Sequence, residues 1–311
     1  EDSLNIDLDL VRKLSPDSLS IMEFKNETDI EIAKKILKFP LLGEKIGDKW
    51  NLKLTAEFHM TNDSHLFKTE LANGRLPLYE GKMIHQFTHQ FDLSQLRYWI
   101  DEKEARQDIL GKVKDTNQKL DYQDYRLGFR KIASNTNERT MVSTVVAPTF
   151  CSENFQVALS FNDNQKRYIQ YNEMLFLCAV WNSFSFDFML RQRVSANINF
   201  FYVYQLPVPR LQKGDQWFDA IVQRAAKLIC TTPEFDDLAQ EIGLESHKNS
   251  VTNEVQRGQI RAEIDGIIAH LYGLTESEFA YILTTFPIVA DPLKQNALNA
   301  YRDVRTGLIK P

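Results

Sequence analysis

The densest group of hydrogen-bonding side chains in this sequence lies in residues 134–140 (SNTNERT), between two β-rich runs. Asn can pair with the exposed edge of adenine, Arg can pair with guanine, and Glu can accept a hydrogen bond from cytosine. The same residue types also build hairpin turns, because Ser and Asn hydrogen-bond to their own backbone. A base-contacting loop and a plain turn are therefore both open interpretations. The candidate contacts are Asn135, Asn137, Glu138, Arg139 and Thr140.

A second polar cluster occupies residues 80–86 (EGKMIHQ). Gly81 allows a ligand to approach the backbone closely, and Lys82, His85 and Gln86 supply hydrogen-bond donors. The alternative interpretation is again a turn between two strands.

Basic residues precede the first cluster and return further along the chain. Cations in these positions could hold the phosphates of a nucleic acid. Asn197 and Asn199 lie near the second basic group, Arg191 and Arg193. The alternative interpretation of that group is a helix end that faces solvent. The candidates are Arg126, Arg130, Lys131, Arg191 and Arg193.

Two arrangements of residues could suggest a metal ion. His85 and His89 have the i,i+4 spacing of helical metal ligands, but they lie in a β-rich region without a third ligand nearby. Asp17, Glu23 and Lys25 resemble the carboxylate and lysine set of a metal-dependent nuclease, which is the alternative enzymatic function. Their spacing is too short for the two strands that normally present such groups, so we predict no metal site.

Motifs for catalysis and cofactor binding are missing from the sequence. It contains no Asn-Pro-Pro-aromatic tetrapeptide, no glycine-rich dinucleotide or phosphate loop, no GxSxG and no HExxH. We therefore predict no catalytic residue and no cofactor in this chain.

The elements that position the polar clusters are mostly strands. Residues 29–39 are expected to form a helix that ends at Pro40, and residues 76–87 a strand, a tight turn at Gly81 and a second strand. Residues 101–120 are expected to be a surface helix or a mobile connection. Further strands are expected at residues 51–59, 125–133, 140–147 and 200–204.

Helical periodicity dominates the second half of the sequence. An apolar helix is expected at residues 172–185, and amphipathic helices follow Pro209. Thr275 is the expected cap of the helix at 276–284, and Asp265 falls on the apolar stripe of the longest helix. The amphipathic helices are expected at residues 217–230, 234–242, 252–272 and 276–284.

These elements predict a mixed α+β fold, with a curved β-sheet and packing helices followed by a C-terminal helical bundle. A change from strands to helices near Pro209 places a boundary there. We predict a lead-in at residues 1–70, a recognition domain at 71–210 and a helical region at 211–311.

Composition limits the class of protein. A hydrophobic content of 43% suits a globular core, and no apolar run reaches the roughly 20 residues that cross a bilayer. The three cysteines form no pair motif, which suits a reducing cytoplasm. These observations predict a cytoplasmic protein without a membrane segment. The cysteines are Cys151, Cys178 and Cys230.

The charge distribution is more informative than the net charge of −5, which on its own argues against a nucleic-acid partner. Residues 121–213 carry 10 basic and 7 acidic side chains, a balance of +3, whereas residues 214–311 carry 9 and 14, a balance of −5. A basic middle segment thus precedes an acidic helical tail. The tail suggests a second alternative, a scaffold that docks another protein.

Several segments, in order along the chain, carry a family resemblance. They include LYEGKMI at 78–84, FRKIA at 129–133, TNERT at 136–140 and the aromatic and proline run at 201–209. Together with 58–67 and 264–274, these segments resemble the target-recognition region of bacterial N6-adenine DNA methyltransferases. The similar proteins are restriction-modification methylases of the type II, type IIG or Eco57I-like kind. Their specificity domains are similar to the C-terminal domain of the TaqI methyltransferase.

The resemblance implies a function for this chain. It implies sequence-specific binding of double-stranded DNA, with Glu138 and Arg139 contacting bases and Lys82 near the DNA backbone or a flipped base. It also implies a catalytic methyltransferase domain in the same polypeptide, which would bind S-adenosylmethionine and carry the missing tetrapeptide. A start at Glu1 instead of Met fits a fragment of such a protein.

Overall fold

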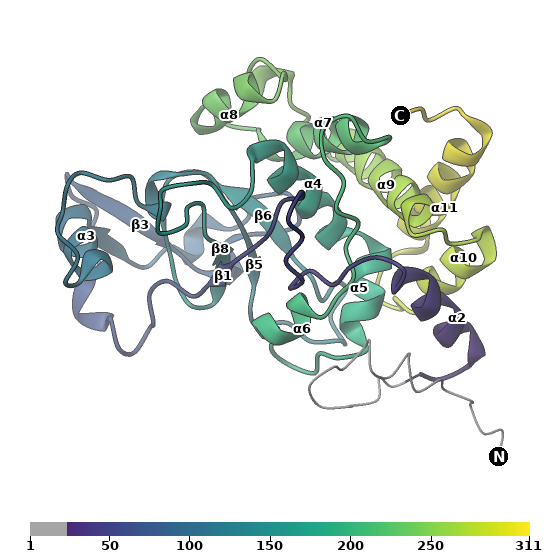
Figure 1. Ribbon diagram of the computed structural model, residues 1–311, viewed down its shortest axis with the longest axis horizontal. Coiled ribbons are helices and arrows are strands. Elements are labelled where there is room, and N and C mark those ends of the chain that lie inside the picture. The colour runs from purple at the N-terminus through teal and green to yellow at the C-terminus, as the bar shows by residue number, and fades with distance from the viewer. Residues whose placement is uncertain (1–23) are drawn as a thin grey trace.

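The computed structural model describes residues 24–311, and Figure 1 shows a β-rich lobe beside a larger helical body. Two small sheets and several helices make up the chain, so the predicted mixed α+β class is confirmed. Two residues of the nuclease alternative, Asp17 and Glu23, lie outside the described residues.

The first sheet contains four antiparallel strands in the order β1 (Leu54–Thr55), β8 (Phe155–Ala158), β5 (Arg126–Arg130) and β6 (Ser143–Val146). At the centre of β5, a Cβ atom on Gly128 would lie 2.6 Å from the Phe155 ring. Glycine is therefore required where that ring covers the strand.

The second sheet lies further out in the lobe. Its order is β2 (Phe67–Lys68), β4 (Trp99–Asp101), β3 (Arg75–Tyr79) and β7 (Phe150–Cys151), and only β3 and β7 are parallel. Helix α3 (Glu102–Leu110) follows β4 directly, because the Asp101 side chain accepts hydrogen bonds from the first-turn amides.

Helices form the rest of the described chain. Helix α4 (Tyr171–Asn182) packs between the first sheet and α7, and most of its surface is buried. Among residues 24–311, no single helix is long and apolar enough to span a membrane; α4 and α5 meet that criterion only as a pair bent by 61°. The other helices are α2 (Glu27–Ile36), α5 (Phe184–Arg191), α6 (Phe200–Tyr204), α7 (Phe218–Ile229), α8 (Asp236–Glu241), α9 (Glu254–Leu271), α10 (Glu276–Thr284) and α11 (Asp291–Thr306). Single turns of 3₁₀ helix lie at Ser64–Leu66, Gly81–Met83, Leu93–Gln95, Asp121–Gln123, Pro233–Phe235 and His247–Asn249.

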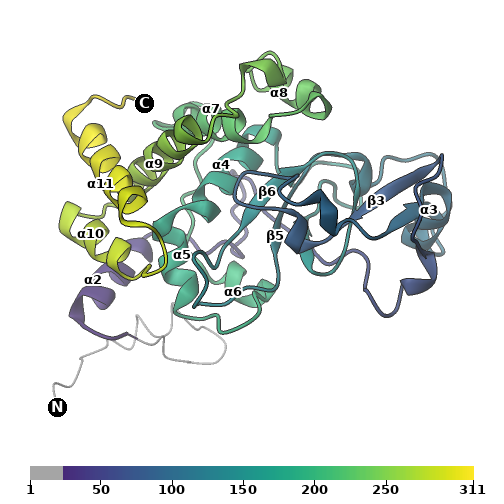
Figure 2. The ribbon, with the colours of Figure 1, turned by 180° about the vertical axis from the view of Figure 1, so that it is seen from behind.

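Helices α9 and α11 lie side by side, as Figure 2 shows from behind. A Cβ atom on Gly266 would lie 2.7 Å from backbone atoms of Ala300 and Tyr301. The missing side chain thus lets the two backbones approach closely. This contact fixes the helix that carries Asp265.

Local signals predicted many of these elements correctly. Strands β5 and β6 and helices α4, α7, α8, α9 and α10 occupy their predicted ranges to within a few residues. Thr275 caps α10 as predicted, since its Oγ1 accepts from the Glu278 amide at 3.3 Å and Glu278 accepts from the Thr275 amide at 2.7 Å.

Other predictions were wrong. Residues 200–204 form helix α6, not a strand, and only Val203 of this helix is fully buried. The segment after Gly81 begins with a 3₁₀ turn, Gly81–Met83, instead of the predicted second strand. Of the predicted strand at 51–59, Leu54–Thr55 forms the short strand β1 and Phe58 makes an isolated bridge to Ser152, and α11 was not predicted.

The hydrophobic core crosses the boundary that was predicted near Pro209. One cluster of buried residues extends from Ile30 in α2 through Phe129 and α4 to Val304 in α11. Arg210, which follows Pro209, is 6% exposed and donates to the carbonyl oxygens of Leu41, Leu42, Glu44 and Trp50. The segment at the predicted boundary is therefore packed into the core region.

Candidate nucleic-acid interface

The polar loop, defined as residues 134–138, has a fixed backbone and three side chains without a partner among the described residues. Arg191 donates to the carbonyl oxygen of Asn135 at 2.7 Å and also to that of Asn137. The side chains of Asn135, Asn137 and Glu138 are exposed and have no hydrogen-bond or ion-pair partner among the described residues. The loop therefore presents two amides and a carboxylate that remain available to a ligand.

Backbone pairing extends this arrangement on the N-terminal side of the loop. The Ala133 amide donates to the Ala196 carbonyl at 3.0 Å, and the Ile198 amide donates to the Lys131 carbonyl at 2.8 Å. The structure thus brings Asn197 and Asn199 close to the polar loop. From the sequence, these two residues were grouped with Arg191 and Arg193 and not with the polar loop.

Arg139 anchors the loop from inside the protein. Its Nε donates to the Asp187 carboxylate at 2.9 Å, its Nη2 donates to the Asn182 carbonyl at 2.6 Å, and its guanidinium lies 4.1 Å from the centre of the Phe184 ring. The Arg139 side chain is 8% exposed and the Asp187 side chain is 0% exposed. This burial is at odds with the predicted role of Arg139 as a base reader.

Asp187 also holds the residues that follow Arg139. It accepts from the amides of Thr140 at 3.1 Å and Met141 at 2.9 Å. Thr140 is fully buried, and its hydroxyl donates to the Ser134 carbonyl at 3.0 Å. Thr140 is therefore a second anchor of the loop, not the exposed base contact that was predicted.

The other arginines that were predicted to contact phosphates also donate hydrogen bonds to groups of this protein. Arg126 is 1% exposed and donates to Glu57 at 2.8 Å, so burial removes it from the predicted phosphate contacts. Arg130 donates from Nε to the Gly81 carbonyl at 2.7 Å and from Nη2 to the Ile84 carbonyl. Arg193 is half-buried and donates to Gln205 at 2.5 Å. Arginines that are buried with such partners hold the backbone and side chains of the protein in position.

The segment at residues 80–86 keeps one exposed cation. Lys82 is 40% exposed and lies 3.7 Å from Glu80, which Arg97 also binds through two hydrogen bonds of 2.9 and 3.0 Å. Gln86 is buried and uses its amide nitrogen on the carbonyls of Met141 and Asn182. Of the predicted contacts in this segment, Lys82 is the most accessible.

His85 is half-buried between these groups. Burial, together with the nearby Arg130 and other arginines, lowers the pKa of His85 to about 4. The imidazole is therefore neutral near pH 7. Its ring centre lies 4.8 Å from that of the exposed Phe91 ring, and the two rings are tilted by 34°.

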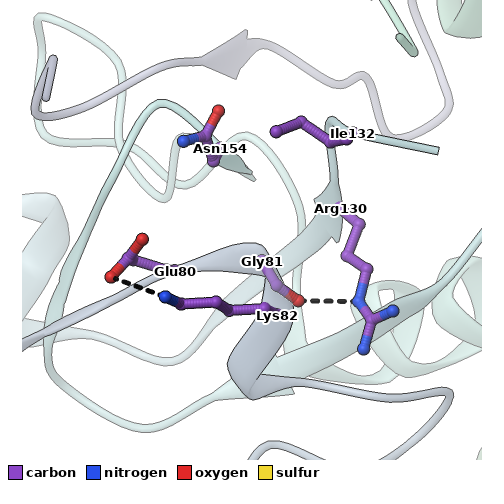
Figure 3. Close-up of a pocket in the computed structure, with 6 residues that line it drawn as sticks. All are labelled: Glu80, Gly81, Lys82, Arg130, Ile132 and Asn154. Carbon is purple, nitrogen blue, oxygen red and sulfur yellow. Dashed lines mark hydrogen bonds and ion pairs between the residues drawn. The ribbon is translucent and has the colours of Figure 1, made fainter. Parts of the chain in front are cut away.

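A cavity of about 190 Å³ lies beside the 80–82 backbone. Figure 3 shows the six residues that line it. Its wall includes Lys82, Ile132 and Asn154, and Arg130 donates to the Gly81 carbonyl at its edge. A Cβ atom on Gly81 would lie 2.5 Å from the Asn154 carbonyl oxygen, so the chain requires glycine here. Lys131, 3.7 Å from Glu153, adds a partly exposed cation from the end of β5.

Metal-binding side chains do not gather in the part of the chain that the structure describes, where no three His, Cys, Asp or Glu residues form a group. His89 lies 2.8 Å from Glu234 and is 2% exposed. Lys25, the third residue of the nuclease alternative, lies with Arg191 and Asn135 around a small polar pocket.

Comparison with known proteins gives little further information. No protein-family model and no curated protein matches the sequence. Among solved structures, one similar chain belongs to the type IIL restriction-modification enzyme MmeI in complex with DNA. The TM-score is 0.42 and the identity is 10%, over 78% of this chain. This chain spans 37% of that chain.

Proposed function

We propose that this chain is a sequence-specific DNA-recognition module, and that its polar loop contacts base edges in a duplex. The observation that carries the proposal is the free amide and carboxylate side chains of Asn135, Asn137 and Glu138 on a backbone held by Arg191 and Arg139. A backbone that is already fixed reduces the entropy that binding costs, and the unpaired side chains have no internal hydrogen bond to break before they bind.

The chemistry of each side chain assigns its role in this proposal. Asn135 and Asn137 can donate to and accept from adenine, and Glu138 can accept from the cytosine amino group. Lys82, Lys131 and Arg97 lie near the loop or the 80–86 segment and would contact phosphates. Each is paired with a carboxylate, so we expect a modest dependence on salt.

We further propose that the module belongs to a cytoplasmic restriction-modification protein that methylates adenine at N6. This part of the proposal rests on the sequence resemblance described above. A catalytic domain of the same polypeptide would bind S-adenosylmethionine and transfer the methyl group, whereas this chain holds and reads the duplex.

Selection from a random duplex library, followed by anisotropy titration at low salt, tests the proposal. We expect wild-type protein to enrich one sequence, and the Asn135→Ala/Asn137→Ala double variant to lose about tenfold in preference for it. Asn296→Ala, which changes an exposed Asn of α11, is the matched control and should behave as wild type. Failure of the full chain to bind any duplex would overturn the proposal.

A further inference from the structure

A second cavity, of about 200 Å³, lies beside the polar loop between the 85–86 segment and helices α5 and α9. Glu138 of the loop lies at its wall, together with His85, Gln86 and Asp265. The four residues come from three distant parts of the sequence, and three of them belong to the two polar clusters predicted from the sequence. We call this space the α9 cavity.

Asp265 is the most unusual group in the α9 cavity. It is 6% exposed, accepts one hydrogen bond, from the Phe184 amide at 2.8 Å, and has no ion pair among the described residues. Burial raises the pKa of its carboxyl to about 6. Its other carboxylate oxygen has no protein partner among the described residues, so a ligand in the cavity can donate a hydrogen bond to it.

Three further polar groups of the cavity can also accept hydrogen bonds. Gln86 uses its amide nitrogen on two backbone carbonyls, which leaves its oxygen as an acceptor. Glu138 has no partner, and His85 is neutral, so one of its ring nitrogens can accept. The set is thus matched to a ligand that offers an exocyclic amino group, whose two N–H donors can meet two acceptors.

The walls of the cavity limit the ligand further. Phe184, Val289 and Leu293 provide apolar surface for a flat ring. Two arginines, Arg139 and Arg261, also line the space and would repel a cation. The ligand that fits is a neutral aromatic ring with hydrogen-bond donors.

We propose that the α9 cavity binds one amino-bearing nucleobase, adenine or cytosine. The base would come either from a free nucleoside or from DNA bound at the polar loop, where a base that leaves the stack can enter the adjoining space. The second source rests on the proposed DNA-binding function, and the first does not.

Gly258 gives a way to fill the cavity without disturbing the fold. It lies in α9 at the cavity wall, and a Cβ atom added there would meet nothing within 4 Å. Replacing a helical glycine also favours the helix. The test variant is Gly258→Leu, and Gln256→Leu adds the same side chain at an exposed position of α9 as the matched control.

The first arm of the test is calorimetric titration with adenosine, cytidine and uridine. We expect adenosine and cytidine to saturate wild type and Gln256→Leu, and to bind at least about tenfold more weakly to Gly258→Leu and Asp265→Asn. Uridine lacks the amino group of cytidine and should also bind about tenfold more weakly to wild type. Equal affinity for cytidine and uridine, or unchanged binding by Gly258→Leu, would overturn the proposal.

The second arm uses the selected duplex with 2-aminopurine placed at each position in turn. We expect a several-fold rise in fluorescence at one position with wild type, and none with Gly258→Leu, while anisotropy reports DNA binding by both proteins. Bound DNA with no fluorescence change, together with no nucleoside binding, refutes the α9 cavity and leaves the proposed function standing. Nucleoside binding without any DNA binding refutes the proposed function alone.

Discussion

The polar loop and the 80–86 segment were both predicted to contact DNA, yet they use their side chains in opposite ways. In the loop, Arg191 and Arg139 hold the backbone, and the loop's own Asn and Glu side chains stay free. In the 80–86 segment, Gln86 turns inward and Glu80 is held by Arg97, so Lys82 is the main exposed contact. Polar residue type alone does not distinguish the two regions; the direction of the side chains does.

This difference shows that one set of side chains holds the loops in place and another set remains available to a ligand. The arginines, which have five donors in a rigid fork, bind several backbone carbonyls at once and so fix loops. The shorter Asn and Glu side chains, with fewer rotatable bonds to order, are left at the surface. A contact loop built in this way is arranged before a ligand arrives.

The largest expected effect is the loss of stability in Arg139→Ala. This change leaves the buried Asp187 carboxylate without its cation, so we expect the free energy of unfolding to fall by about 3 to 5 kcal/mol. Urea denaturation measures it. The neighbouring Glu138→Ala should stay within about 0.5 kcal/mol of wild type. A stable Arg139→Ala protein that has lost its base preference would instead make Arg139 a reader.

The next largest effect concerns Asp265→Asn and depends on pH. Burial raises the pKa of Asp265 from 3.8 to about 6, with Arg139 and Arg261 opposing the shift and Asp187 adding to it. The folded protein thus holds this proton more tightly than the unfolded chain, and wild-type stability falls as the pH rises from about 4 to about 6. The amide cannot ionise, so the variant should exceed wild type by about 1 to 3 kcal/mol at pH 7.

Denaturation of both proteins at pH 4 and pH 7 checks this expectation. The stability difference between Asp265→Asn and wild type should shrink toward pH 4, where the wild-type carboxyl is protonated. A difference that stays constant between the two pH values would contradict the assigned pKa shift.

A smaller effect is expected when the free carboxylate of the loop is changed. Glu138→Gln keeps the shape of the side chain but adds a donor where cytosine presents its own amino group. We expect a loss of about 1 kcal/mol in preference at one base pair, without a change in stability. Competition titrations with singly substituted duplexes measure this preference. An equal loss on every duplex would place Glu138 outside the base contacts.

The smallest effect should come from the 80–86 segment. Lys82→Ala removes one exposed cation and should weaken binding to all duplexes alike, with the slope of log affinity against log salt reduced by about one. Lys248→Ala, at an exposed position near α8, is the control and should leave the slope unchanged. A change in sequence preference in Lys82→Ala would erase the distinction between the two regions.

Local sequence determined the elements whose signals lie within one turn or one strand. The capping box of Thr275 and Glu278, the apolar helix α4 and the β-rich strand β5 were predictable because neighbouring residues carry them. Asp265 was also noticeable in the sequence, because it is a carboxylate on the apolar stripe of α9. Its one hydrogen bond, from the Phe184 amide 81 positions away, could not be predicted from the sequence.

Only the tertiary structure decided which polar residues face outward. Arg139 meets Asp187 across 48 positions, and Arg126 meets Glu57 across 69, so no local pattern marks either arginine as buried. The short helix α6 likewise formed where residue type alone favoured a strand, and it buries Val203 in the core. Residue types along the chain predicted a mixed fold and a polar loop. The long-range pairing of charges selected the side chains that remain free to bind.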